Sequence, residues 1–231
     1  MTKVVDCHTC PQQARNDAKR QIAPFVSGSL TITHPIPVVI VVFLSLFVLT
    51  ASGLEIRGRV TSIWEKNSFT IETRSDETVL WFDLPSNTRI IAQAEASDSP
   101  IKRVRVKMNE PFILTGMKEW RITIFWDSVD CNWGCRLVKG EEPVLNRVQG
   151  YASTDFAFNW SLVTEEDVET WNFAYPKDAT FIVRWKAAGA RGAEEQDLSD
   201  DTKVKLIGTG IFNIEVDPVD GEGEFTAERV K

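Results

Sequence analysis

The chain has 231 residues, with 26 Lys and Arg against 33 Asp and Glu, a net charge of −7. Its first 54 residues carry four of the basic and two of the acidic residues, so the other 177 hold 22 basic and 31 acidic side chains. This acidic balance excludes non-specific nucleic-acid binding as the main function. Both histidines, His8 and His34, lie in the first 34 residues, which leaves the remaining chain without imidazole chemistry.

Residues 1–34 are polar and then rich in Ser, Thr and Pro, which predicts a flexible N-terminal tail. Cys7, His8 and Cys10 place two thiols and an imidazole within four residues, and together they could supply three ligands to zinc. A closed zinc site usually has four ligands, so the fourth would have to come from a partner chain. The alternative is a pair of metal-free thiols, reduced or acylated. No other cofactor is predicted.

Residues 35–54 are predicted to form one transmembrane α-helix. No Asp, Glu, Lys or Arg occurs from Gln21 to Leu54, and the nineteen residues from Ile36 would reach about 28 Å as a helix. A cleaved signal peptide is the competing interpretation, because Thr50 to Gly53 offers small residues to a peptidase. Basic residues are more numerous just after this segment than just before it, and that local count alone favours a cytoplasmic domain. Long domains, however, translocate largely regardless of charge, so we expect a cytoplasmic tail and an extracytoplasmic or lumenal domain.

Residues 55–216 show a hydrophobic period of two, which is typical of half-buried strands. The runs 59–64 and 68–73 are expected to pair as a hairpin, and 119–126 is the strongest core strand. The frequency of such runs predicts nine to twelve strands in one β-rich globular domain. Its fold class is all-β, an antiparallel β-sandwich or a partly open barrel.

Three segments near the C-terminus depart from simple alternation. Thr164 with Asp167 resembles a helix capping box, which predicts one short helix over 164–171. Gly208 and Gly210 interrupt an apolar face within 203–216, which favours a bend where the chain crosses between sheets or closes a barrel. Residues 217–231 have little to bury and are predicted to form a disordered acidic tail.

Further candidate sites fall on the predicted strands. Cys131 and Cys135 would form a disulfide if the domain is outside the cytosol, although a five-residue ring is geometrically demanding. Lys102, Arg103, Arg105 and Lys107 form a basic stripe, interpreted as an interaction face or as the solvated side of a sheet. Asn159 begins a glycosylation sequon.

The chain contains no phosphate-binding glycine loop, nucleophile elbow or metalloprotease helix, so an enzyme is not the expected class. We predict a single-pass membrane protein with a non-catalytic β-rich domain that binds other proteins, as a structural or accessory subunit. Its expected partners are the lipid bilayer and other protein subunits, including further copies of itself. The alternative is a membrane-anchored carbohydrate-binding protein or carboxylate-dependent glycosidase, since a glycosidase needs only two acidic residues and Trp can stack on sugars.

Overall fold

The computed structural model describes residues 53–60, 67–108, 110–127, 130–177, 179–199, 201–220 and 222–230. The predicted tail with Cys7, His8 and Cys10, and the predicted transmembrane helix up to residue 52, lie outside these residues. Within the part that is described, no helix is long and apolar enough to cross a bilayer.

The described residues form sixteen strands. In the N-terminal half these are β1 Glu55–Val60, β2 Asn67–Glu72, β3 Glu77–Asp83, β4 Ile90–Ala96, β5 Ser99–Val106, β6 Pro111–Thr115, β7 Glu119–Trp126 and β8 Cys131–Lys139. In the C-terminal half they are β9 Val144–Ser153, β10 Phe158–Thr164, β11 Val168–Ala174, β12 Thr180–Ala187, β13 Glu194–Asp197, β14 Lys203–Ile207, β15 Gly210–Asp220 and β16 Glu222–Arg229.

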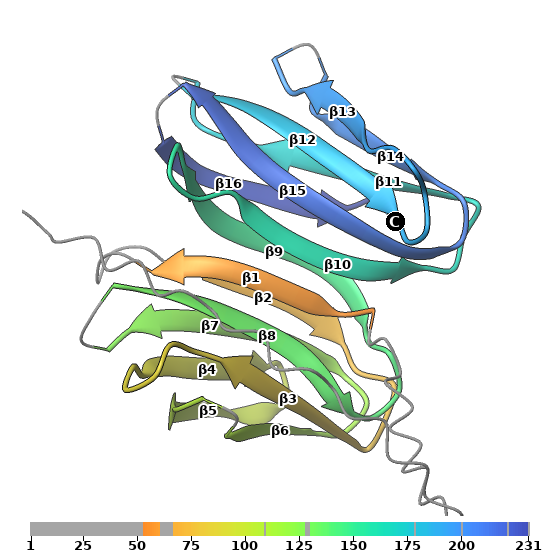
Figure 1. Ribbon diagram of the computed structural model, residues 1–231. Helices are drawn as coiled ribbons and strands as arrows, with labels where there is room; N and C mark the ends of the chain where they lie inside the picture. The colour runs from red at the N-terminus through yellow and green to blue at the C-terminus, as the bar shows by residue number, and fades with distance from the viewer. Residues whose placement is uncertain are drawn as a thin grey trace, which may run out of the picture. The chain divides into compact units, whose positions relative to one another are not determined.

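The strands build two antiparallel sheets of eight that pack face to face, as Figure 1 shows. Sheet A has the order β13-β12-β15-β10-β1-β8-β3-β6, and sheet B has the order β14-β11-β16-β9-β2-β7-β4-β5. The predicted all-β antiparallel sandwich is therefore confirmed. The strand count exceeds the expected nine to twelve because the C-terminal segment and several short edge segments also pair.

The strand order reveals an internal duplication. In the N-terminal half, four strands of one sheet run β1-β8-β3-β6 and four of the other run β2-β7-β4-β5. Adding eight to each strand number gives the arrangement of the C-terminal half. Two sheets of four with this order define a jelly roll, so the chain contains two jelly rolls in tandem. They join edge to edge through the pairs β1·β10 and β2·β9, which we call the seam.

One aromatic core runs across the seam. The ring of Phe158 makes edge contacts with Trp133 and Phe225, at centroid distances of 6.3 and 5.3 Å. Gly58 of β1 and Gly150 of β9 leave the space that this ring fills, because a Cβ on Gly150 would lie 2.5 Å from two of its carbons. The two glycines on β1 and β9 therefore leave room for the Phe158 ring between them, and the two jelly rolls share one packed interior.

The predicted helix over 164–171 is wrong. Thr164 ends β10, and its Oγ1 donates to the Gly208 carbonyl at 2.8 Å, so its hydroxyl does not cap a helix. Trp171 and Phe173 alternate with exposed positions in β11 and are buried. Tertiary pairing of β11 with β14 and β16 outweighs the local capping signal.

The predicted disordered tail over 217–231 is also wrong. Strand β15 continues to Asp220, and β16 lies between β9 and β11 in the middle of sheet B. Phe225 and Ala227 of β16 are buried in the core. The predicted crossing near Gly208 and Gly210 is confirmed: both adopt positive φ, and the chain passes there from sheet B to sheet A.

Candidate functional site: a polar groove at the seam

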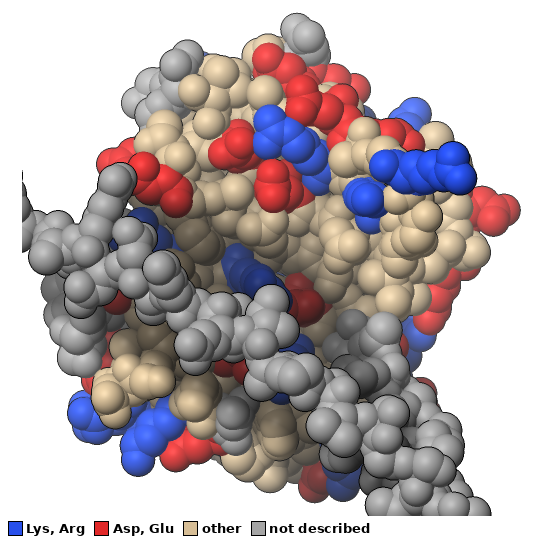
Figure 2. All heavy atoms as spheres, viewed as in Figure 1, with Lys and Arg blue, Asp and Glu red and all other residues tan. Residues whose placement is uncertain are grey.

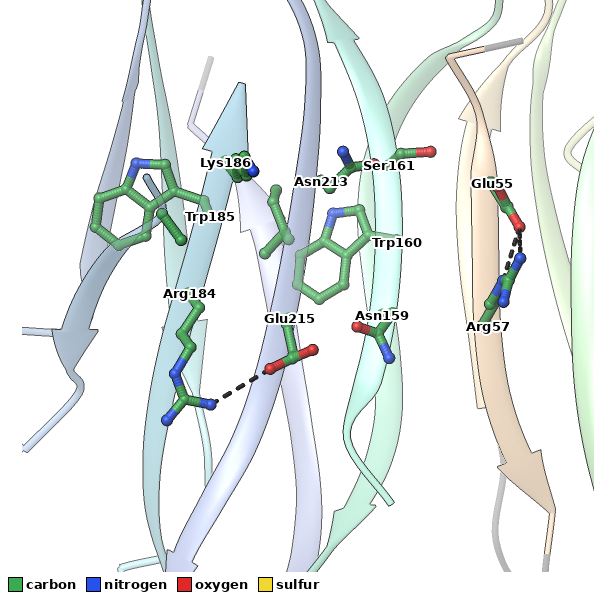
Figure 3. A pocket seen from close by; sticks show the side chains of 12 residues that line it. Glu55, Arg57, Asn159, Trp160, Ser161, Arg184, Trp185, Lys186, Asn213 and Glu215 are labelled. Atoms are coloured by element: carbon green, nitrogen blue, oxygen red, sulfur yellow. Dashed lines mark hydrogen bonds and ion pairs between the residues drawn. The ribbon is translucent and has the colours of Figure 1, made fainter. Parts of the chain in front are cut away.

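A groove of about 490 Å³ lies on the outer face of sheet A, where β12, β15, β10 and β1 run side by side (Figure 3). It spans the seam, because β1 belongs to the first jelly roll and the other three strands to the second. Figure 2 looks onto the same side of the molecule and shows basic and acidic side chains interspersed over the upper half.

Strand register explains why polar side chains gather in this groove. Side chains alternate between the two faces of a sheet, so cross-strand neighbours form rows on one face. Two such rows line the groove: Arg57, Asn159, Glu215 and Arg184, and beside it Glu55, Ser161, Asn213 and Lys186. Each row draws on four strands that are distant in sequence, so it exists only when both jelly rolls are assembled.

Arg184 is the most heavily engaged cation of the groove. Its Nε lies 2.7 Å from Glu195, and its NH1 group lies 2.9 Å from Asp217 and 3.3 Å from Glu215. The hydrogen bonds with Asp217 and Glu195 raise the pKa of the Arg184 guanidinium. Because this side chain is 34% exposed, each ion pair contributes little to stability, and the cluster mainly fixes where the charges lie.

The other polar side chains of the groove make fewer hydrogen bonds and ion pairs than Arg184. Arg57 pairs with Glu55 of its own strand, with 2.7 Å between Arg57 Nε and Glu55 Oε1. Lys186 and Asn213 are exposed, and their side chains make no hydrogen bond or ion pair within the described part of the chain. The groove thus offers an ammonium, two amides and part-neutralised charges to a partner, a composition suited to polar recognition.

The start of the domain is attached directly beside this groove. Ser161 Oγ donates to the Gly53 carbonyl at 2.6 Å, and the Gly53 amide donates to Glu142 Oε2 at 3.1 Å. Leu54, the next residue, is 1% exposed and packs in the core. A Cβ on Gly53 would lie 2.0 Å from Val163 Cγ2, so any larger residue would have to displace the Val163 side chain. Gly53 and Leu54, the last two residues of the predicted transmembrane helix, therefore belong to the sandwich, so the predicted C-terminal bound of that helix is wrong by two residues.

Glu142 belongs to the connection between β8 and β9, the link between the jelly rolls. Burial raises its pKa, and the amides of Gly53 and Leu54 oppose the shift. One of its carboxylate oxygens has no hydrogen-bond partner among the described residues. The cavity at this place, which Arg74 and Arg229 also line, measures about 10 Å³. That volume suits at most one water, so it is no substrate site.

Among the described carboxylates, burial also raises the pKa of Glu169. It accepts a hydrogen bond from Trp171 Nε1 at 2.7 Å and pairs with Arg229 at 3.0 Å. Its Oε1 therefore holds the Trp171 indole within β11, and only its Oε2, through the ion pair with Arg229, links β11 to β16. Within the described residues, no group of three or more His, Cys, Asp or Glu could hold a metal ion.

The predicted disulfide is wrong. Cys131 and Cys135 are both free thiols, and both face the core from the same strand, β8. Residues four apart on a strand are separated by about 13 Å, whereas a disulfide needs Cα atoms about 4.4 to 6.8 Å apart. Burial raises the pKa of both thiols, so neither resembles a reactive cysteine.

The predicted basic stripe lies on β5, the edge strand of sheet B. Arg103 and Arg105 are exposed on its outer face, where Arg103 lies over the Phe125 ring and Arg105 pairs with Asp127 at 3.2 Å. Lys107, just beyond the strand, is also exposed. Lys102 points the other way, because its Nζ donates to the Ile113 carbonyl of β6 at 2.6 Å. The structure thus separates Lys102 from the other three.

The remaining predicted residues also have defined places. Asn159 lies within β10, half-buried in the groove, and its Nδ2 donates to the Ala157 carbonyl at 2.9 Å. Glycosylation there stays a prediction. Five tryptophans are buried, and Trp81 is partly covered by Arg136, whose guanidinium lies 5.5 Å from its ring centroid. The buried set comprises Trp120, Trp133, Trp160, Trp171 and Trp185.

Most groove residues were not predicted from the sequence. Arg184, Ser161 and Asn213 occupy ordinary outward positions of alternating strands, which carry no local signal of a shared site. Knowledge of the strand order would have aligned them, because their rows follow from the registers of β1, β10, β15 and β12.

Neither protein families nor curated proteins match the sequence. Among solved structures, a 7S globulin of Momordica charantia is 6% identical, with a TM-score of 0.24 over 74% of this chain and 71% of that chain. A vicilin of hazelnut, Corylus avellana, is 5% identical, with a TM-score of 0.25 over 78% of this chain and 77% of its own. Similarity at this level carries no functional argument. The class of this protein, a tandem jelly-roll sandwich, follows from its own strand pairing.

Proposed function

We propose that this chain is a single-pass membrane protein that holds its tandem jelly-roll sandwich at the lipid surface and binds other proteins there without catalysis. The attachment of Gly53 is the observation that carries the proposal. Both backbone groups of this residue are bound by side chains of the sandwich, and Leu54 is already part of the core. A transmembrane helix that ends before Gly53 would therefore position the sandwich against the bilayer with no intervening linker.

The interaction role rests on the groove. Its side chains come from both jelly rolls, and most of its charges are paired with neighbouring side chains, so it suits polar contacts better than proton transfer. The two carboxylates with raised pKa, Glu142 and Glu169, lie outside the groove lining and hold backbone or core groups. The expected partner is a protein segment with polar and acidic side chains that reach Lys186 and Asn213.

The anchor is tested by alkaline carbonate extraction of membranes from cells that express the full chain. We expect the wild-type protein in the pellet, and the variant Val42→Lys with Leu44→Lys in the supernatant, because each charge at the bilayer centre costs about 2.5 to 3.5 kcal/mol. The matched control is Val138→Lys with Val230→Lys, two exposed apolar positions of the sandwich. Wild-type protein that is fully extracted would refute the anchor.

The interaction role is tested by a photo-crosslinking amino acid placed at Lys186 or Asn213 in the same membranes. We expect adducts with other proteins from these two groove positions and none from Arg121, an exposed position on the outer face of sheet B. Equal labelling at all three positions, or none in the groove, would contradict the proposed contact surface. Protease protection of the sandwich in sealed vesicles would support the extracytoplasmic orientation.

Carbohydrate binding is the second candidate, supported by the amides of Asn159 and Asn213 beside Glu215 in the groove. It lacks a stacking platform among the described residues of the groove, because Trp160 and Trp185 are 2% and 7% exposed and pack into the core. Glycan binding that Asn213→Ala abolishes would favour this candidate. The zinc site of Cys7, His8 and Cys10 remains a separate proposal, tested by the metal content of the purified full chain.

A further inference from the structure

The two far ends of the sandwich carry equivalent edge strands. Strand β5 ends sheet B in the first jelly roll, and β13 ends sheet A in the second. They occupy equivalent positions in the two jelly rolls, because β13 follows β5 by eight strands and each repeat has eight strands. Within the described residues each pairs with one strand only, β5 with β4 and β13 with β12. Each therefore presents one backbone edge on which another strand can add.

These two equivalent strands carry opposite charge. Residues 99–107 contain four basic and no acidic side chains, and residues 193–197 contain three acidic and no basic ones. The basic set is Lys102, Arg103, Arg105 and Lys107, and the acidic set is Glu194, Glu195 and Asp197. Charged edges normally block pairing between identical strands. Here β5 repels β5 and β13 repels β13, whereas β5 and β13 attract each other.

The side chains also lie on matching faces. Arg103 and Arg105 are exposed and point outward from sheet B, on the face of their cross-strand neighbours Gln93 and Ile91. Glu195 pairs across β12·β13 with Arg184 on the outer face of sheet A, and Asp197, two residues on, shares that face. An antiparallel β5·β13 pair would therefore place two arginines beside two carboxylates on one continuous outer face.

Both ends have the same construction across the sandwich. Lys102 of β5 reaches the Ile113 carbonyl of β6 at 2.6 Å, and Gln196 of β13 reaches the Lys203 carbonyl of β14 at 3.2 Å. These hydrogen bonds link the edge strand of sheet A to the edge strand of sheet B at both ends of the sandwich. A β5·β13 pair between two copies would therefore also bring β6 of one copy close to β14 of the other. Arg105 and Glu195 have side chains that are 66% and 55% exposed. Their present partners each keep a second ion pair, Asp127 with Arg89 at 3.9 Å and Arg184 with Asp217 at 2.9 Å, so the exchange costs little.

We propose that copies of this chain associate head to tail, with β5 of one copy adding antiparallel to β13 of the next. The two surfaces lie at opposite ends of one chain, so the contact is heterologous and repeats into a row or a closed ring. This inference goes beyond the proposed function, since it concerns contacts between copies and does not require the groove or the anchor.

The test measures the mass of the purified full chain, in mild detergent, by light scattering over a concentration series. The wild type is expected to form a ladder of oligomers that weakens between about 0.1 and about 1 M salt. Variant one, Arg103→Glu with Arg105→Glu, and variant two, Glu195→Lys with Asp197→Lys, should each associate at least about tenfold more weakly. An equimolar mixture of the two should regain association, because the acidic β5 of variant one can pair with the basic β13 of variant two, and their unchanged edge strands also remain complementary.

The matched control is Arg121→Glu with Arg147→Glu, the same charge change on central strands of sheet B, which should associate like the wild type. Recovery in the mixture also shows that both variants are folded. The proposal is overturned if the wild type stays monomeric at every concentration, if either variant associates as the wild type does, or if the mixture fails to associate. None of these results bears on carbonate extraction or groove crosslinking, so the two proposals fail separately.

Discussion

Substitution of Gly150 by Ala probes the packing that joins the two jelly rolls. The new Cβ would lie 2.5 Å from Cδ2 and Cε2 of Phe158, about 1 Å inside ordinary contact. The ring cannot easily retreat, because Trp133, Trp160 and Phe225 surround it at centroid distances of 6.3, 6.3 and 5.3 Å. Overpacking of this kind costs about 1 to 3 kcal/mol, against about 0.5 to 1 kcal/mol gained by removing a strand glycine.

We therefore expect a net loss of about 1 to 2 kcal/mol for Gly150→Ala, which lowers the thermal midpoint by about 2 to 8 °C in a domain of this size. Denaturant unfolding of the full chain, followed by tryptophan fluorescence, gives the free energy directly. Gly134→Ala is the matched control. A Cβ there meets its nearest atom, Asp83 Cβ, at 3.5 Å, so this variant should lose nothing.

A double-mutant cycle decides whether the Phe158 ring is the cause. Phe158→Leu alone leaves a cavity and should cost about 1 to 3 kcal/mol. Combined with Gly150→Ala it frees the space that the new methyl group needs, so the double variant should be at least about 1 kcal/mol more stable than the sum of the single effects predicts. Additive costs, or a Gly150→Ala variant as stable as Gly134→Ala, would refute the argument.

Ser161→Ala should cost about 1 to 3 kcal/mol by denaturant unfolding, because the Gly53 carbonyl loses its buried donor; an effect near zero would show that water replaces the hydroxyl. Burial raises the pKa of Glu142, so its ionisation opposes folding as pH rises through that pKa. The Glu142→Gln variant should gain stability relative to the wild type as the pH rises above the ordinary glutamate pKa of about 4.3, and a pH-independent difference would contradict this. Cys131 and Cys135 should resist alkylation until the chain is denatured, as peptide mapping can check; a disulfide between them would refute the same-strand geometry.

The predicted strands were the part of the fold that local sequence could supply. Alternation along 119–126 predicted β7, and Trp120, Ile122 and Ile124 are buried as that pattern requires. The alternation reports only which side chains face inward, not which strand lies beside which. For that reason the duplication into two jelly rolls was not predicted, although the glycines at 208 and 210 correctly indicated a crossing between sheets.

The errors share one physical origin, since each followed a local signal that tertiary contacts overrode. The capping pattern at Thr164 predicted a helix, but β11 pairs with a strand on each side. The acidic C-terminal segment forms β16, because Phe225 packs against Phe158 in the core at the seam. The spacing of Cys131 and Cys135 suggested a small ring until an extended strand separated them. Local preference is weak beside the burial of large aromatic side chains.

The sequence by itself determined that the described domain is all-β, that no imidazole serves it, and that an uncharged apolar run precedes it, because these follow from composition and period alone. Only the tertiary structure decided that the sandwich is a duplicated jelly roll, that Glu142 and Ser161 hold Gly53, and that the groove residues share one face. Those features depend on register between distant strands: Arg57 in β1 and Glu215 in β15 are 158 positions apart and both align with Asn159 in β10. Such register is set by packing of the whole core and leaves no trace in any single segment.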